Sequence, residues 1–459
     1  MLLSELSQRR VAIWGFGREG QATLEVLQEK LPSLEVTILN DKEIDMSAHP
    51  RLSSEHCEVL TGARVLSSLS DFEVVIKSPG ITPYIPAVEA AKEQGTVFTS
   101  ATNIWFANHP TQKTICVTGT KGKSTTSSLI AFLLEAAGHS VTLAGNIGVP
   151  LLQHFQSPEP PDFFVVELSS YQTSDFTGAP DIGVLLNLYP EHLNWHGDVE
   201  SYFRDKTKLF NHMRSDGITI LNGQDAQTSQ MPNVWTNPYY YMTEEGFHVR
   251  EDGIYKGDML AVPGSLLSLR GAHNWANVCA ALSVLEALSI PWQEAVQSLP
   301  SFRGLAHRLM PIGERDGRLF IDDSISTTPQ SAIAAMDAYR HRPITLLVGG
   351  YDRQLDVTPL VESLLSTPIH AVITMPDTGS RIAEDLLHRG AALEGGVPFL
   401  LERTQSLEEA VTKALSCTDE GGVVLLSPAA PSYHQFKNFQ ERGEVFAKLT
   451  GCAKKETQS

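Results

Sequence analysis

The sequence predicts an α/β protein of several domains, each built on a parallel sheet. The chain has 459 residues, which is too long for one ordinary domain and suggests about three. Short apolar runs bounded by glycine or proline alternate with helical patterns, an order typical of parallel strands joined by crossover helices. Some of these runs, such as residues 163–167 and 182–188, are apolar almost throughout, as expected for strands buried on both faces.

The expected elements fall into three blocks, which predict domains at residues 1–108, 109–308 and 309–459. Residues 106–112 are polar with a proline and predict a linker, whereas residues 215–270 are rich in aromatic side chains and turns and predict a small antiparallel part. The main helices are expected at residues 21–30, 125–137 and 273–288, with Gly138 as a left-handed cap after the second. The strands are expected at residues 11–14, 35–39, 74–76, 114–117, 163–167, 182–188, 319–322, 345–348, 371–374 and 423–426.

Composition argues against several classes of partner. The net charge is −18, and nucleic acids and anionic membranes carry the same sign. The first residues lack the pattern of a signal peptide, and no window reaches the roughly 18 apolar residues of a membrane span. The five cysteines are widely spaced without a CxxC pair, as is typical of reduced thiols. We therefore expect a cytoplasmic monomer that binds neither nucleic acid nor membrane.

A phosphate-binding loop is the strongest local signal. Small residues let backbone N–H groups turn toward phosphate oxygens, and the following helix adds the partial positive charge of its N-terminus. In this pattern the lysine reaches the β- and γ-phosphates and the serine hydroxyl binds Mg²⁺. The motif is a shortened variant, because Val117 stands where the full consensus has glycine. The alternative, a glycine-rich turn with an unrelated lysine, is disfavoured by the strand before it and the helix after it. The loop consists of Gly119, Thr120, Lys121, Gly122, Lys123, Ser124 and Thr125.

Two side chains near this loop are candidate metal ligands. Glu167 ends an apolar strand, so its carboxylate is expected at the carboxyl edge of the sheet beside the loop. His192 follows the next such strand. Each has an ordinary alternative, an exposed strand-end glutamate and a satisfied polar histidine. Together with the loop they predict a metal site.

The first block carries a GxGxxG turn after its first strand, at residues 15–20, with Asp41 about 20 residues further on. This turn alone is compatible with NAD, with another nucleotide, or with a tight turn that binds nothing. Because an ATP loop is present as well, the pair points away from simple hydride transfer and toward a substrate that itself contains a pyrophosphate.

The ordered motifs together resemble those of the Mur ligases over nearly the whole chain. The motifs are GTKGKS (119–124), GNIG (145–148), ELSSYQ (167–172), GAHNWAN (271–277), FRGLAHR (302–308), DS (323–324), SPA (427–429) and FKNF (436–439). The resemblance implies three domains: a Rossmann-like domain that binds a UDP substrate, a central P-loop ATPase domain, and a Rossmann-like C-terminal domain that brings an amino acid. It implies an ATP-dependent ligase that activates a carboxylate as an acyl phosphate and joins it to an amine, with two Mg²⁺ ions.

The resemblance also assigns roles to residues of this chain. Lys123, His192 and Lys206 would be catalytic, and Lys206 falls where the family carries a carbamylated lysine, with Lys208 close by. The metal ligands would be Ser124, Glu167, His192 and carbamylated Lys206. ATP would be bound by the loop together with Asn274, Asn277, Arg308 and Asp323. The UDP substrate would be bound by Gly15, Phe16, Gly17, Arg18, Asp41, Ser78, Pro79, Gly80, Asn146 and His192, and glutamate by Thr327, Arg353, Ser432, Tyr433 and Phe439.

Within the family the motifs are most similar to the branch that adds glutamate to UDP-N-acetylmuramoyl-L-alanine in peptidoglycan synthesis. Departures from its pattern lie in the third block, where Ile325 and Arg353 replace lysines and His434 replaces a common aspartate. An arginine fork binds a carboxylate with another geometry than a lysine. The run Ser326-Thr327-Thr328-Pro329 together with Arg353 resembles a subgroup that adds L-glutamate, and it predicts that enantiomer over D-glutamate.

Three alternatives remain open from the sequence. A folylpolyglutamate-synthase-like ligase shares the chemistry but lacks a comparable UDP-binding block. An NAD-dependent oxidoreductase would use the turn at residues 15–20. A non-catalytic nucleotide sensor is disfavoured by Lys123, Glu167 and His192.

Overall fold

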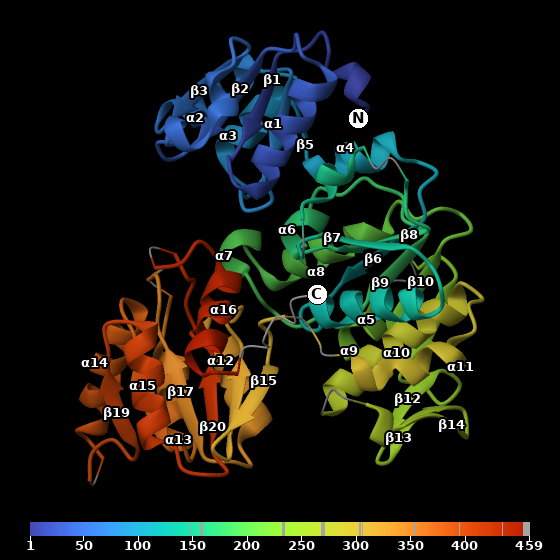
Figure 1. Cartoon of the computed structure of the whole chain (residues 1–459). Helices are drawn as coiled ribbons and strands as arrows, with labels where there is room; N and C mark the ends of the chain where they lie inside the picture. The colour runs from blue at the N-terminus through green and yellow to red at the C-terminus, as the bar shows by residue number, and fades with distance from the viewer. Residues whose placement is uncertain are drawn as a thin grey trace, which may run out of the picture. The chain divides into compact units, whose positions relative to one another are not determined.

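The chain forms two compact units, Met1–Phe302 and Arg303–Ser459, seen in a computed structural model (Figure 1). Gly148 of the GNIG motif, Arg353 and His434 lie outside the described residues. Among the described helices, none is long and apolar enough to cross a membrane. The structure describes residues 1–147, 149–156, 159–231, 235–267, 271–302, 304, 306–352, 355–393, 395–433 and 435–452.

The first sheet of the first unit is five-stranded and parallel, in the order β3-β2-β1-β4-β5. Alternate residues of β1 enter different cores, Val11 and Ile13 one, Ala12 and Trp14 the other. Both faces of the strand are therefore covered, which explains its unbroken apolar run. The elements are β1 (Val11–Trp14), α1 (Arg18–Lys30), β2 (Val36–Asn40), β3 (Cys57–Thr61), α2 (Arg64–Ser68), β4 (Val74–Lys77), α3 (Pro86–Glu93), β5 (Val97–Thr99) and α4 (Ala101–Asn108).

The second sheet of this unit is six-stranded and parallel, in the order β11-β10-β9-β6-β8-β7. Helices α5 and α10 pack against each other and against strands of the sheet. The strands are β6 (Thr114–Thr118), β7 (Val141–Gly145), β8 (Phe163–Glu167), β9 (Ile182–Leu185), β10 (Ile218–Asn222) and β11 (Pro238–Tyr241). The helices are α5 (Lys123–Ala136), α6 (Ser170–Thr173), α7 (Leu193–His196), α8 (Val199–Thr207), α9 (Ala226–Gln230), α10 (Ala272–Ala287) and α11 (Trp292–Ala295).

The antiparallel part is smaller than the sequence predicts. Strands β12 (Phe247–Arg250), β13 (Gly253–Lys256) and β14 (Met259–Pro263) form it. The expectation was wrong for residues 218–241, because β10 and β11 extend the parallel sheet, with Ile220 opposite Tyr239. Tyr241 is buried in the same core as Ile220, so the tyrosine-rich run is a parallel edge strand.

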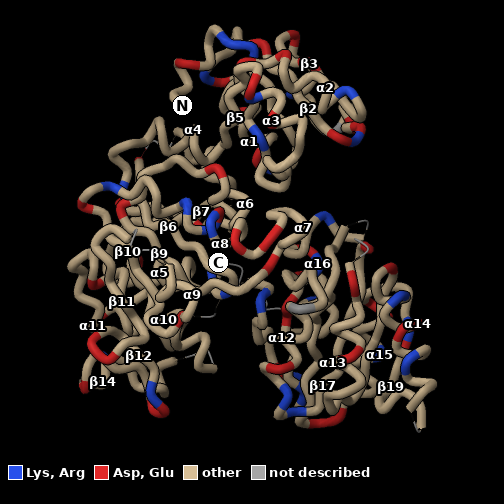
Figure 2. The backbone as a smooth tube through the Cα atoms, turned by 180° about the vertical axis from the view of Figure 1, so that it is seen from behind, with Lys and Arg blue, Asp and Glu red and all other residues tan. Residues whose placement is uncertain are grey.

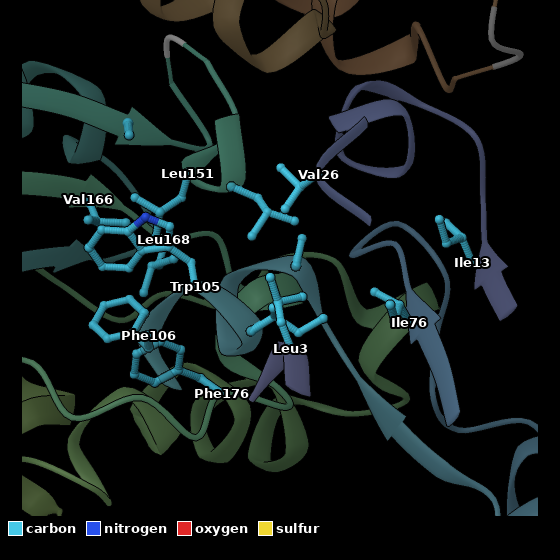
Figure 3. Close-up of a cluster of buried hydrophobic side chains, with 14 of the residues drawn as sticks. Leu3, Ile13, Val26, Ile76, Trp105, Phe106, Leu151, Val166, Leu168 and Phe176 are labelled. Atoms are coloured by element: carbon cyan, nitrogen blue, oxygen red, sulfur yellow. The ribbon is translucent and has the colours of Figure 1, made fainter. Parts of the chain in front are cut away.

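A single core runs from the first sheet into the second within this unit. The side chains of Trp105 and Phe106 on α4 lie in it, 0% and 7% exposed, together with Ile13, Val166 and Phe176 (Figure 3). The expected linker is therefore wrong at its start. Residue 106 belongs to a buried helix, and the chain leaves that helix only after Asn108.

The second unit is built on a six-stranded sheet in the order β15-β16-β20-β17-β18-β19. Only β15 is antiparallel to its neighbour. Helices α12, α13 and α14 contribute to the core on one face, and α15 and α16 to the core on the other. The elements are β15 (Met310–Arg315), β16 (Arg318–Asp322), α12 (Pro329–Tyr339), β17 (Ile344–Val348), α13 (Thr358–Ser366), β18 (Ala371–Thr374), α14 (Thr378–Gly390), β19 (Leu400–Arg403), α15 (Leu407–Cys417), β20 (Val423–Leu426) and α16 (Phe439–Leu449).

Candidate active site

The phosphate loop lies between β6 and α5, as its sequence predicts. Asn187, after β9, fastens it: the Thr120 N–H donates to the Asn187 carbonyl (3.0 Å) and the Lys121 N–H to its side-chain oxygen (2.8 Å). Gly122 has φ +85°, and a Cβ there would lie 2.6 Å from the Asn277 side-chain oxygen on α10. The loop and a residue implied to bind adenine are thus in direct contact. Asn274 lies one turn earlier on the same helix.

Two lysine ammonium groups meet at one carbonyl oxygen of this loop. Lys123 Nζ donates to the Gly119 oxygen at 2.9 Å, and Lys206 Nζ, from α8, donates to the same oxygen at 3.0 Å. Lys206 is 1% exposed. Burial holds the pKa of Lys206 well below its ordinary value, and the charge of Lys123 lowers it further. This arrangement favours a neutral Lys206 amine or a bound anion between the two groups.

The predicted neighbour Lys208 has a different environment. Its Nζ pairs with the buried Asp205 carboxylate at 2.9 Å and donates to the Ser174 carbonyl at 2.6 Å. Asp205 also accepts from Tyr84 Oη and lies 2.8 Å from the ring of His196. Lys208 therefore belongs to a hydrogen-bond network around the buried Asp205 of α8, whereas Lys206 faces the phosphate loop.

Glu167 ends β8 at the carboxyl edge of the sheet, where the sequence places it. The residue is 1% exposed, so it is not an exposed strand-end glutamate. One carboxylate oxygen accepts from Asn146 Nδ2 at 2.7 Å. The other is buried and has no hydrogen-bond partner among the described residues. A buried carboxylate oxygen that lacks a donor fits a cation ligand.

His192 caps the N-terminus of α7 and lies in the left-handed region, with φ +56°. Its Nε2 lies 3.8 Å from the carboxylate of Glu191. Burial lowers the pKa of His192, Glu191 raises it, and the charge of Lys123 lowers it. The lowered pKa favours the neutral imidazole, which is the form that binds metals.

Glu191 was missed as a site residue. Its carboxylate pairs with Lys121 Nζ at 2.6 Å and raises the pKa of Lys206. The sequence feature that could have identified Glu191 is its position between a strand end and His192.

In the described part of the chain, no three His, Cys, Asp or Glu side chains gather as a ready-made metal group. A magnesium ion here could draw on Glu167 and His192, on the hydroxyl of Ser124 and on a carbamate of Lys206, with water and substrate phosphates as its other ligands. All four residues border the loop or lie at the carboxyl edge of its sheet, and the unpartnered oxygen of Glu167 fits this set.

The candidate UDP-binding loops follow β1 and β4 and touch each other. Ser78 Oγ donates to the Gly15 carbonyl at 2.9 Å, and a Cβ at Gly15 would lie 2.8 Å from that hydroxyl. The Gly80 carbonyl accepts from Trp195 Nε1 on α7. Phe16 is 9% exposed and packs edge-on against His49, so its ring belongs to the core. Gly17, Arg18 and Asp41 are exposed, and Pro79 is half-buried.

Asn40 was missed. Its side chain accepts from the Phe16 N–H at 3.0 Å, so it, rather than the neighbouring Asp41, fastens the GxGxxG turn.

A buried polar cluster links this turn to the ELSSYQ motif. Gln172 Nε2 donates to Glu19 at 2.8 Å, and Gln172 Oε1 accepts from the Ser169 N–H at 3.0 Å. Lys77 pairs with Asp175 at 3.4 Å beside them. Burial raises the pKa of Glu19 to about 7, with Asp175 adding to the rise.

In the second unit, Asp323 is 2% exposed, and its carboxylate forms hydrogen bonds within that unit. Its carboxylate accepts from the Leu309 N–H at 3.0 Å and from Ser427 Oγ at 2.7 Å, and burial raises its pKa to about 6. Arg308 is half-buried and close enough to lower that pKa.

Of the candidate glutamate residues, Thr327, Ser432 and Tyr433 lie on loops of this unit, and Phe439 is the first residue of α16. Thr327 and Phe439 are half-buried, Ser432 is buried and Tyr433 is 49% exposed. Arg353 lies outside the described residues.

The sequence matches two families over most of its length. Residues 117–285 match the Mur ligase middle domain, and residues 307–430 match the Mur ligase glutamate ligase domain. The chain belongs to the Mur ligase family. Proteins named UDP-N-acetylmuramoyl-L-alanine–L-glutamate ligase are similar to this Mur ligase at full length: 39% identity in Xanthomonas oryzae and 40% in Xylella fastidiosa, over 98% of this chain and 97% of each relative.

Solved structures support the same fold. The UDP-N-acetylmuramate–alanine ligase of Thermotoga maritima matches with a TM-score of 0.58 at 16% identity, over 96% of this chain and 99% of that one. The MurF ligase of the same organism, solved with ADP, matches with a TM-score of 0.56 at 16% identity, over 97% and 98%. The predicted α/β fold class is confirmed. This Mur ligase is thereby an ATP-dependent ligase that forms an amide bond, and the oxidoreductase and sensor alternatives are not supported.

Proposed function

We propose that this enzyme adds L-glutamate to UDP-N-acetylmuramoyl-L-alanine, with ATP converted to ADP and phosphate. The observation that carries the chemistry is the meeting of Lys123 and Lys206 at the Gly119 carbonyl, beside the unpartnered oxygen of Glu167. The names of the full-length relatives support the substrates.

The first step forms an acyl phosphate. A carboxylate oxygen of the UDP substrate bonds to the γ-phosphorus of ATP, and the bond from that phosphorus to the bridging oxygen breaks, so that ADP leaves. Negative charge concentrates around the transferred group, and the ammonium group of Lys123 stabilises it. Mg²⁺, held by Ser124, Glu167, His192 and carbamylated Lys206, would supply the remaining positive charge.

The second step forms the amide. The neutral amine of glutamate bonds to the acyl carbon, its extra proton is lost, and phosphate leaves from the tetrahedral intermediate. Water competes for the acyl phosphate, so the site must exclude it. The phosphate loop belongs to the first unit of the chain, and the candidate glutamate residues belong to the second.

The proposed preference for L-glutamate rests on the resemblance of residues 326–329 and Arg353 to the subgroup that adds this enantiomer. Part of this run begins α12, where Thr328 caps the helix by accepting from the Ser331 N–H at 3.3 Å and Pro329 occupies the first turn. Thr327 lies just before this cap and is half-buried. The relatives' names also specify L-glutamate.

The decisive experiment measures ADP release with UDP-N-acetylmuramoyl-L-alanine and either enantiomer of glutamate. We expect efficient turnover with L-glutamate and far less with D-glutamate. A preference for D-glutamate would contradict the proposed handedness while leaving the ligase reaction intact. ADP release should disappear in folded Lys123→Ala and persist in Lys113→Ala, which removes a lysine just before β6. Equal activity of both variants would refute the assignment of Lys123.

A further inference from the structure

Arg442 on α16 is a buried cation that hydrogen-bonds to neutral groups. The residue is 2% exposed. Its Nε donates to Ser324 Oγ at 3.0 Å, and its Nη2 donates to the backbone carbonyls of Ser324 (2.7 Å) and Ala430 (3.0 Å). In the part of the second unit that the structure describes, no carboxylate bonds to it, and its Nη1 is buried without a partner.

The contacts of Arg442 reach three loops at the same edge of the sheet. Ser324 follows β16, and Ala430 follows β20. Gly350 follows β17, and a Cβ there would lie 3.0 Å from Arg442 Nη1. Parallel strands bring their carboxyl ends together, so one guanidinium hydrogen-bonds the loops after β16 and β20 and packs close to the loop after β17. Ser324 Oγ also donates to the Phe439 carbonyl at 2.8 Å, which ties the start of α16 to the same cluster.

These braced loops carry the candidate glutamate residues. Thr327 is three residues beyond Ser324, Ser432 is two beyond Ala430, and Phe439 is joined through Ser324 Oγ. We propose that Arg442 is a positioning residue that sets the geometry of the site for the incoming amino acid. This inference rests on the proposed function.

Burying the guanidinium of Arg442 costs hydration free energy, which indicates that the side chain serves to position the loops rather than to stabilise the fold. Burial lowers the pKa of its guanidinium to about 10, and only the charge of Asp322 raises it. A buried charge loses its hydration, and an apolar side chain of similar volume is often as stable or more so. What an apolar side chain cannot do is donate to two carbonyls and a hydroxyl on separate loops. A lysine is a single point donor and cannot span them either.

The test compares Arg442→Lys and Arg442→Met with the wild-type enzyme, using the KM of each substrate. A loop displaced by about 1 Å can lower activity by up to about 100-fold. We expect the KM of glutamate to rise about 10- to 100-fold, with the KM of ATP and of the UDP substrate changed less than about twofold. Acyl phosphate trapped as a hydroxamate with hydroxylamine, in the absence of glutamate, should form at the wild-type rate.

The matched control is Arg389→Met on α14, which removes a half-exposed arginine from the same unit. It should leave all three KM values unchanged. A folded Arg442 variant with an unchanged glutamate KM, or with all three KM values raised alike, would overturn the proposal. So would a loss of hydroxamate formation.

Should both Arg442 variants fail to fold, Ser324→Ala decides the question. It removes one acceptor of Arg442 and the link to Phe439 without burying a new group, and a selective rise in the glutamate KM is again expected. An unchanged KM in this variant would overturn the inference. Failure of the proposed function is distinguishable, because the wild-type enzyme would then release no ADP with either enantiomer.

Discussion

At the scale of single residues, the buried amine of Lys206 is the group whose chemistry the fold changes most. An exposed lysine is almost entirely protonated at pH 7, and the protonated amine does not react with CO₂. Burial and the nearby charge of Lys123 lower the pKa of Lys206, which makes the neutral amine available. That amine can bond to CO₂ and release a proton, leaving a carbamate whose oxygens are suited to Mg²⁺.

The carbamate that the resemblance implies on Lys206 predicts a rescue experiment. Lys206→Ala should lose most ligase activity, because a metal-binding anion is removed from beside Glu167, and acetate or another short-chain acid should restore part of it. Adding ¹³CO₂ to the wild-type enzyme should give a carbamate carbon signal by NMR that the variant lacks. An Arg204→Ala variant on the same helix, which removes an exposed cation, is the control for the helix itself. Absence of both rescue and signal would contradict the carbamate on Lys206.

At the scale of elements, the first turn of α1 is joined to α6 through Glu19 and Gln172. The pKa of Glu19 rises on folding from 4.5 to about 7, because burial disfavours its charge. The folded chain therefore binds more protons than the unfolded chain between these values. The stabilising contribution of Glu19 is complete below about pH 4.5 and is lost as pH rises through about 7. Burial raises the pKa of Asp175 as well, which acts in the same direction.

Glu19→Gln should therefore flatten the pH dependence of the first unit. The substituted amide still offers an oxygen to Gln172, but it does not titrate. Between pH 5 and pH 8 the free energy of unfolding should fall by about 2 kcal/mol less than in the wild type, measured by urea unfolding. Glu25→Gln removes a carboxylate that is 41% exposed on the same helix and serves as control. Equal slopes in both variants would contradict the assignment.

The sequence predicts elements well where periodicity and local turn chemistry act together. The strands at 11–14, 163–167, 371–374 and 423–426 have the predicted bounds, and Gly138 takes φ +89° after α5. Strand pairing is not a local property, so the tyrosines of β11 could not be assigned to a parallel edge before β10 was seen beside them.

The candidate site divides in the same way. Glu167 is predictable because a strand end fixes where its side chain emerges. Other site residues act through contacts with partners distant in the sequence, as do Glu191, Gln172 and Arg442. A single sequence does not show which distant residues are in contact. Arg442 is 118 residues from its partner Ser324.

At the scale of the whole molecule, Lys and Arg are interspersed with Asp and Glu along the helices and loops of both units (Figure 2). The buried cores of the two units are separate from each other. One core of the first unit extends through α4 from the first sheet into the second, so those two sheets should unfold together. The second unit has its own two cores, one on each face of its sheet.

Phe106→Ala tests this division. Phe106 packs edge-on against Phe176 with ring centroids 5.0 Å apart, and its loss should destabilise the first unit by about 3–5 kcal/mol. Hydrogen exchange followed by mass spectrometry should show faster exchange in β1 and in β8 alike, with the strands of the second unit unchanged. Phe446→Ala, which removes a ring that is 0% exposed from the second unit, should give the reverse pattern. Strands that share one cooperative core lose protection together. If Phe106→Ala increased exchange in β1 but left β8 protected, the first two sheets would therefore unfold independently despite their shared core.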